Sequence, residues 1–193
     1  MIFKVSKKTH WYFSFVAILL GIGIGVFGLS LQSPAAPASP KGGQSDIVFT
    51  AILDKAEYTA EEPANLTFVL KNKGKSPGYV NKRFYFGSEE APRNQKEVYV
   101  VVVAPSGEKL PYKFPYETGY PKTDYFALLE PGQEIKADYP RNLRGNFEFK
   151  EEGAYTVTAV YQNTFGRELG LDVFQGKLTA EPVKFTIKKA GGG

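Results

Sequence analysis

Residues 151–161 read EEGAYTVTAVY, and this stretch decides the expected fold class. From Tyr155 onward, every second residue is apolar or aromatic: Tyr155, Val157, Ala159 and Tyr161. Side chains that alternate in this way lie on one face of a β-strand, whereas a helix would repeat them every three or four residues. The stretch therefore predicts a strand with one buried face.

The same period of two recurs on both sides of this strand. Alternating or short apolar runs occupy residues 47–52, 66–71, 98–103 and 183–187. Turn residues separate them, and no apolar stripe with helical spacing extends over ten residues after residue 46. We therefore expect one all-β domain over residues 46–189, an antiparallel sandwich of about seven to nine strands, followed by a flexible tail at 190–193.

The residues before the strand suggest a more specific fold. Glu151-Glu-Gly153-Ala-Tyr155-Thr-Val157 resembles the start of strand F in immunoglobulin-like domains, where a tyrosine hydroxyl closes the corner between strands E and F. In this resemblance Tyr155 is the structural corner tyrosine, and Val157 takes the position that a cysteine holds in antibody domains.

Further motifs extend the resemblance over about two thirds of the chain: Leu66-Thr-Phe-Val-Leu-Lys-Asn72, Ala104-Pro-Ser-Gly107, Pro131-Gly132 and Gly153-Ala-Tyr155. Together they resemble the bacterial immunoglobulin-like modules typified by the intracellular proteinase inhibitor (BsuPI-type) family. The final stretch, Phe174-Gln-Gly176-Lys-Leu178 with Val183-Lys-Phe185-Thr-Ile187, is similar to the last strands of uncharacterised bacterial surface domains. The resemblance implies an immunoglobulin-like antiparallel β-sandwich and, by family, inhibition of proteinases.

An uncharged apolar stretch precedes the domain. Residues 11–31 read WYFSFVAILLGIGIGVFGLSL and, as a helix, would be about 31 Å long, enough to span a bilayer. Three lysines in the basic tail at residues 1–10 place the N-terminus in the cytoplasm. We thus expect a signal anchor in the bacterial cytoplasmic membrane, with the domain in the periplasm or outside the cell.

The stretch between this helix and the domain is rich in proline, alanine and glycine, and residues 32–45 are therefore expected to form a stalk. Ala36-Pro37-Ala38 also fits a cleavage site, so removal of the N-terminal segment after Ala38 is the alternative to an anchor. Within the helix, Gly21 and Gly25 have the G-x-x-x-G spacing that lets two helices approach, which would permit a homodimer.

Composition excludes several kinds of chemistry. The chain has no cysteine, and its one histidine, His10, precedes the membrane stretch, so the domain lacks the bases and thiols of common catalytic sites. Three of the 24 basic residues precede residue 11, whereas all 20 acidic residues follow residue 45, so the domain is nearly neutral. We expect neither an enzyme nor a nucleic-acid-binding protein, and no metal or cofactor.

The most unusual stretch is residues 111–126, PYKFPYETGYPKTDYF, in which prolines and a glycine separate aromatic residues. Such a loop can present rigid aromatic faces to a protein or a glycan. The alternative is that these rings cover the edge of the sandwich and fill its core. The candidate binding residues are Tyr112, Phe114, Tyr116, Tyr120 and Tyr125.

These observations favour a membrane-anchored, extracytoplasmic binding or scaffolding module that engages a protein partner in the cell envelope. The alternatives are a proteinase inhibitor-like module and a glycan-binding domain. Fold alone does not decide among them.

Overall fold

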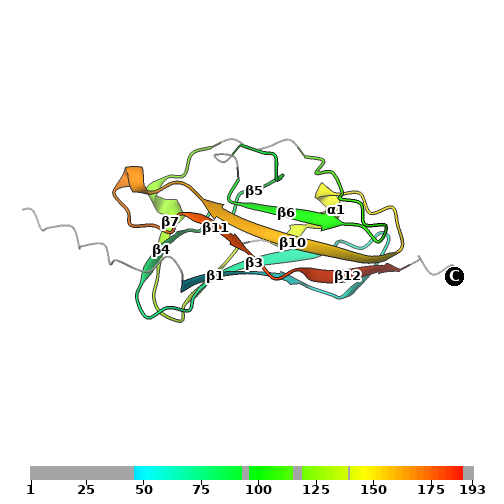
Figure 1. Ribbon diagram of the computed structural model, residues 1–193, viewed down its shortest axis with the longest axis horizontal. Coiled ribbons are helices and arrows are strands. Elements are labelled where there is room, and N and C mark those ends of the chain that lie inside the picture. Colours follow the sequence, from blue (N-terminus) through cyan, green and yellow to red (C-terminus); the bar gives the residue numbers. More distant parts are fainter. Residues whose placement is uncertain (1–45, 93–95, 115–118, 139, 189–193) are drawn as a thin grey trace, which may run out of the picture. The chain divides into compact units, whose positions relative to one another are not determined.

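The computed structural model describes residues 46–92, 96–114, 119–138 and 140–188 (Figure 1). The basic tail, the expected membrane helix with Gly21 and Gly25, the stalk and the C-terminal tail lie outside these residues. Among the residues that are described, no helix is long and apolar enough to cross a membrane.

Two sheets contribute most of the structure, and the first has four strands: β1 (Ile47–Leu53), β3 (Asn65–Asn72), β8 (Glu134–Lys136) and β9 (Arg141–Asn142). The central strand β3 pairs antiparallel with all three others, and β1 pairs with it over its whole length, from Ile47 opposite Asn72 to Leu53 opposite Leu66.

The second sheet has six strands, in the order β2-β12-β10-β6-β5, and β11 also pairs with β10. Their bounds are β2 (Glu57–Thr59), β5 (Phe86–Gly87), β6 (Val98–Val103), β10 (Gly153–Asn163), β11 (Gly176–Thr179) and β12 (Val183–Lys188). The pairs β2–β12 and β5–β6 are parallel and the others are antiparallel. Figure 1 shows β10 running the length of this sheet.

A smaller sheet pairs β4 (Gly78–Asn81) with β7 (Phe126–Leu129). The helices are short connectors: η3 (Thr123–Tyr125), α1 (Leu143–Asn146) and η4 (Arg167–Leu169). In α1 the side chain of Asn142 accepts a hydrogen bond from the backbone N–H of Arg144, which caps the start of the helix.

The core lies between the two large sheets and contains the alternating faces that the sequence predicted. In β10, Tyr155, Val157, Ala159 and Tyr161 are all fully buried. From the opposite sheet, Phe49 and Phe68 pack on this layer, and the ring of Phe49 lies 5.8 Å from that of Tyr161. The all-β prediction is therefore confirmed, and each predicted strand is present within one or two residues of its expected bounds.

Candidate functional site

The aromatic segment is divided between the interior and the surface. Tyr112 and Tyr125 are half-buried, whereas the side chains of Phe114 and Tyr120 are 55% and 71% exposed. Tyr116 lies outside the described residues. Some rings of the segment therefore cover the sandwich, and others are exposed to solvent.

The N-terminal end of the segment is fixed against the sandwich by Tyr112. Its ring contacts Phe86 and Phe147 edge to face, at centroid distances of 5.8 and 5.7 Å. Its hydroxyl accepts a hydrogen bond from Nδ2 of Asn146 at 3.2 Å, and the backbone N–H of Lys113 donates to the carbonyl of Asn146 at 2.9 Å. Phe114 thus projects from a backbone that is held one residue away.

The C-terminal end is fixed by Arg83. One guanidinium nitrogen, Nη1, donates to the carbonyl oxygen of Gly119 at 2.8 Å. The same guanidinium lies over the ring of Tyr85 at 4.0 Å and near that of Tyr125 at 5.6 Å, both cation–π contacts. Tyr120 follows directly and meets Phe165 edge to face at 6.0 Å.

Arg83 is itself held by a buried polar network. Its Nε donates to Oε2 of Glu97 at 2.8 Å, and its Nη2 donates to Oε1 of the same carboxylate. Glu97 also accepts from the backbone N–H of Tyr85 and from Asn81, which in turn bonds to Asn163. A buried carboxylate with this many donors has its lone pairs satisfied, so the pair fixes structure and leaves no free group for chemistry.

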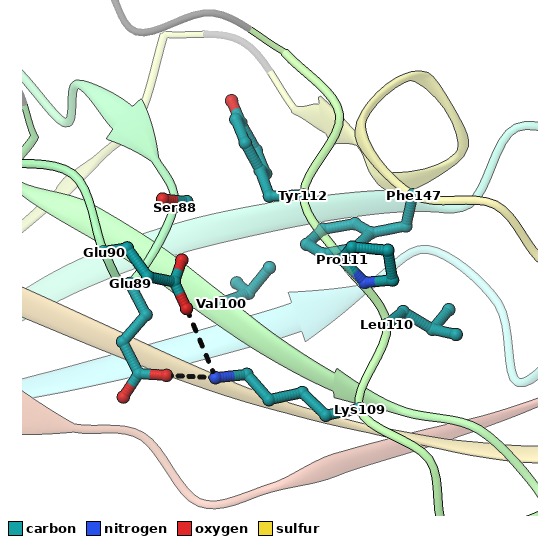
Figure 2. Close-up of a pocket in the computed structure, with 9 residues that line it drawn as sticks. All are labelled: Ser88, Glu89, Glu90, Val100, Lys109, Leu110, Pro111, Tyr112 and Phe147. Atoms are coloured by element: carbon teal, nitrogen blue, oxygen red, sulfur yellow. Dashed lines mark hydrogen bonds and ion pairs between the residues drawn. The ribbon is translucent and has the colours of Figure 1, made fainter.

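A pocket of about 310 Å³ adjoins the Tyr112 end of the segment (Figure 2). It is lined by Ser88, Glu89, Glu90, Val100, Lys109, Leu110, Pro111, Tyr112 and Phe147. Polar residues from the turn after β5 form one side in Figure 2, and the residues after β6 form the other, which is largely apolar.

Lys109 links the two sides of this pocket. Its ammonium forms ion pairs with Glu89 and, at 3.7 Å, with Glu90, as the dashed lines in Figure 2 show. The hydrogen bond to Glu89 raises the pKa of Lys109. The pKa of Glu90 is lowered, chiefly by hydrogen bonds from its own backbone and from Ser88, and then by the charges of Lys109 and Lys96. The carboxylate of Glu90 is thus ionised at neutral pH.

The turn that carries these glutamates is also held from inside. Lys96 is only 3% exposed, and its ammonium donates to the carbonyls of Ser88, at 2.7 Å, and Glu89. It lies 4.8 Å from the centre of the Tyr99 ring. Burial lowers the pKa of Lys96 to about 8, because desolvation disfavours the charged form.

Tyr155 stands apart from this surface, at the start of β10. Its hydroxyl donates to the carbonyl of Glu151 at 2.8 Å and accepts from the backbone N–H of the same residue at 3.0 Å. Its ring stacks on Phe185 at 5.4 Å. The buried ring of Tyr155 thus has its polar end fastened to the turn that precedes β10.

No family model matches the chain, and no curated protein matches it.

Within the four described ranges, no group of three or more histidine, cysteine, aspartate or glutamate residues is placed to hold a metal ion. Glu89 and Glu90 are adjacent on one turn and share Lys109, whereas a hydrolytic carboxylate pair must flank a bond from two sides. What the surface offers is two exposed aromatic rings and a pocket with charged and apolar walls.

Sequence reasoning missed the pocket and the Arg83–Glu97 pair. Of the stretch from Arg83 to Phe86, only Phe86 belongs to a strand, β5. Phe84 has a φ of 50°, in the left-handed region, so the backbone of this stretch is not extended there. The sequence offered one signal for the ion pair, which is that the charged residue Glu97 directly precedes the apolar residues of β6.

Proposed function

We propose that this chain is an immunoglobulin-like module. The strand order supports this assignment: β1, β3 and β8 correspond to strands A, B and E, whereas β12, β10 and β6 correspond to G, F and C. The first strand region is divided between the sheets, because β1 pairs in one sheet and β2 in the other. The short β5, which precedes β6 and runs parallel to it, departs from this pattern.

The proposed function is non-enzymatic binding of a protein partner in the cell envelope. The observation that carries it is the aromatic segment, which is fastened at Tyr112 and at Gly119 and exposes Phe114 and Tyr120. Aromatic rings presented from a fixed backbone lose little conformational entropy on binding, so they make effective anchors in an interface.

The proposed location is the outer side of the bacterial cytoplasmic membrane. It rests on the sequence of residues 11–31 and on the lysines that precede it. Alkaline extraction of membranes tests this: an anchored chain stays in the pellet, whereas cleavage after Ala38 would release it. Exchange of Gly21 and Gly25 for leucine tests the proposed helix dimer, which the larger side chains should separate.

Crosslinking in intact cells tests the partner. A photoreactive residue in place of Lys122, which is exposed in the same segment, should give a specific adduct, and the double variant Phe114→Ala, Tyr120→Ala should prevent capture of the partner. Leu169→Ala is the matched control, because Leu169 is 41% exposed on a different segment. A partner that is captured equally by both variants, or no partner at all, would refute the proposal.

Proteinase inhibition is the second candidate. A segment held at both ends is what an inhibitor needs, because a cleaved loop whose ends stay in place dissociates slowly. Full-length protein in detergent should then inhibit a member of a panel of serine, cysteine and metalloproteinases at micromolar concentration. A chain that leaves the whole panel active excludes this function. The exposed ring of Tyr120 also offers a stacking face for a sugar, which a glycan array would detect.

A further inference from the structure

The exposed ring of Tyr120 lies against a second loop, the connection between β10 and β11. Its neighbour there is Phe165, which is half-buried and meets Tyr120 edge to face, with the ring planes at 86° and the centroids 6.0 Å apart. Two rings at nearly a right angle form a corner, in which the face of one ring stands beside the edge of the other. An apolar side chain that enters this corner contacts both rings at once.

Phe165 is placed by Asn163, the last residue of β10. Asn163 is only 2% exposed, and its Nδ2 donates to the carbonyl oxygens of Phe165 and Phe174, both at 2.8 Å. Its Oδ1 accepts from the backbone N–H of Phe165 at 3.4 Å and from Nδ2 of Asn81 at 3.2 Å. An asparagine amide has two donors and two acceptor sites, so all four are used. The amide therefore holds the loop at both of its ends.

The turn that follows Phe165 is also constrained. The backbone N–H of Gly166 donates to the carboxylate of Glu168 at 3.0 Å, and its carbonyl accepts from the backbone N–H groups of Leu169 and Leu171. Phe165 thus projects from a backbone with little freedom. A ring that is held in this way loses little conformational entropy when it contacts a partner.

The same buried network reaches the aromatic segment. Asn81 donates from Nδ2 to Oε1 of Glu97 at 3.3 Å as well as to Asn163. Glu97 holds the guanidinium of Arg83, whose Nη1 donates to the carbonyl of Gly119. A continuous path of hydrogen bonds through the interior therefore connects the two loops. Fully bonded buried polar groups act together, so the two loops are held as one unit.

We propose that Tyr120 and Phe165 form one contact surface for the protein partner and that Asn163 positions it. The partner inserts an apolar side chain into the corner between the two rings, because the rings are stabilised by hydrocarbon that removes them from water. Asn163 does not touch the partner and acts by holding the loop that carries Phe165. The inference rests on the proposed function and extends its binding surface from residues 111–126 to the loop after β10.

Crosslinking in intact cells tests the extended surface. A photoreactive residue in place of Thr164, which is exposed directly before Phe165, should capture the same partner as one in place of Lys122. Lys184, exposed on β12, is the control position and should not capture it. Phe165→Ala should reduce the adduct from the Lys122 position roughly tenfold, as expected for a ring near the centre of an interface. If Phe165→Ala leaves that adduct unchanged, or if the Thr164 position captures nothing, the extension is wrong.

Fluorine NMR of the full-length chain in lipid nanodiscs tests the positioning without a partner. A 4-fluorophenylalanine label at Phe165 reports on the neighbouring ring, so Tyr120→Leu should move its resonance. Asn163→Ala should move the resonance as well, because the ring then leaves the contact. Asn163→Asp keeps the shape but loses both donors, and it serves where Asn163→Ala does not fold. Asn142→Ala, which removes an exposed capping amide elsewhere, should leave the resonance in place.

The outcomes separate this inference from the proposed function. Gly107→Ala, which strains a turn with nothing within 4 Å of an added Cβ, controls for lost stability and should change neither the Phe165 resonance nor the capture of the partner. A resonance that a folded Asn163 variant leaves at the parent position would refute the positioning role. A resonance that Tyr120→Leu does not move would refute the paired surface, whatever crosslinking shows. Absence of any partner at the Lys122 position would refute the proposed function, and the contact surface with it.

Discussion

Arg83 and Glu97 form a two-point ion pair inside the protein, in which their side chains are 4% and 1% exposed. Arg83 also donates to Gly119 at one end of the aromatic segment. The ion pair therefore connects the core to the surface on which the proposed function depends.

Removing one partner of this pair should destabilise the fold strongly. Glu97→Gln or Arg83→Met leaves the opposite charge buried, and such losses are typically about 3–5 kcal/mol. The double variant Arg83→Met, Glu97→Leu should lose less than the sum of the single variants. Urea denaturation followed by circular dichroism measures this, with Lys188→Met as a control at the exposed pair between Lys188 and Glu57. Additive losses would contradict the coupling.

Loss of the Tyr155 hydroxyl should lower the free energy of unfolding by less than loss of the Arg83–Glu97 ion pair. Tyr155→Phe keeps the ring stacked on Phe185 but removes the hydroxyl that joins the carbonyl and N–H of Glu151. We expect a loss of about 1–2 kcal/mol in the free energy of unfolding, with an unchanged fold. Equal urea midpoints for the variant and the parent would show that the corner contributes nothing.

Two glycines with positive φ should respond differently to alanine. At Gly166, φ is 113°, which strains any residue with a side chain. An added Cβ would also overlap Val173 and lie 2.9 Å from Cε1 of Phe126, so Gly166→Ala suffers from both backbone strain and steric overlap. At Gly107, φ is 89° but nothing lies within 4 Å, so only the backbone strain of about 1–2 kcal/mol applies. The melting temperature should therefore fall further for Gly166→Ala than for Gly107→Ala. A reversed order would show that packing around Gly166 relaxes.

Lys96 predicts a specific dependence of stability on pH. Its pKa is about 8 in the folded chain and 10.5 in the unfolded chain, so between these values the unfolded state binds more protons. Stability should therefore rise from pH 8 toward pH 10, with a slope of at most about 1.4 kcal/mol per pH unit. The sign is opposite for Tyr58 and Tyr161, whose raised pKa values make stability fall at higher pH.

Lys96→Met isolates this contribution. The rise between pH 8 and pH 10 should disappear, although the variant also loses the hydrogen bonds to Ser88 and Glu89. Lys184→Met is the control, because Lys184 is exposed on β12 and is not among the charges that act on Lys96. A pH profile that Lys96→Met leaves unchanged would contradict the assignment.

The predicted strands and the structure agree where one face of a strand is buried and the other is not. In β1, Phe49 is buried and Thr50 is exposed, which is the alternation that the sequence shows. The short strands β2, β4 and β9 were missed, because two to four residues are too few to display a period. Their pairing depends on strands that are distant in the sequence.

The candidate site was less predictable, for a physical reason. The aromatic segment was recognisable from composition, but which rings face inward depends on partners such as Phe86 and Phe147. The pocket requires the turn at Glu89, Lys109 and Phe147 to meet, and these are separated by about 20 to 60 residues in the sequence. No local sequence pattern indicates that these distant residues come together in the fold.

The parallel pairing of β2 with β12 has a mechanical consequence. These strands are near the two ends of the folded domain, and Thr186, Ile187 and Lys188 pair with Glu57, Tyr58 and Thr59. When parallel strands at opposite ends of a chain are pulled apart, all their hydrogen bonds share the load in shear and do not open one after another. A domain tethered at its N-terminus, as we propose, would thereby resist tension that a partner transmits through its C-terminal strand.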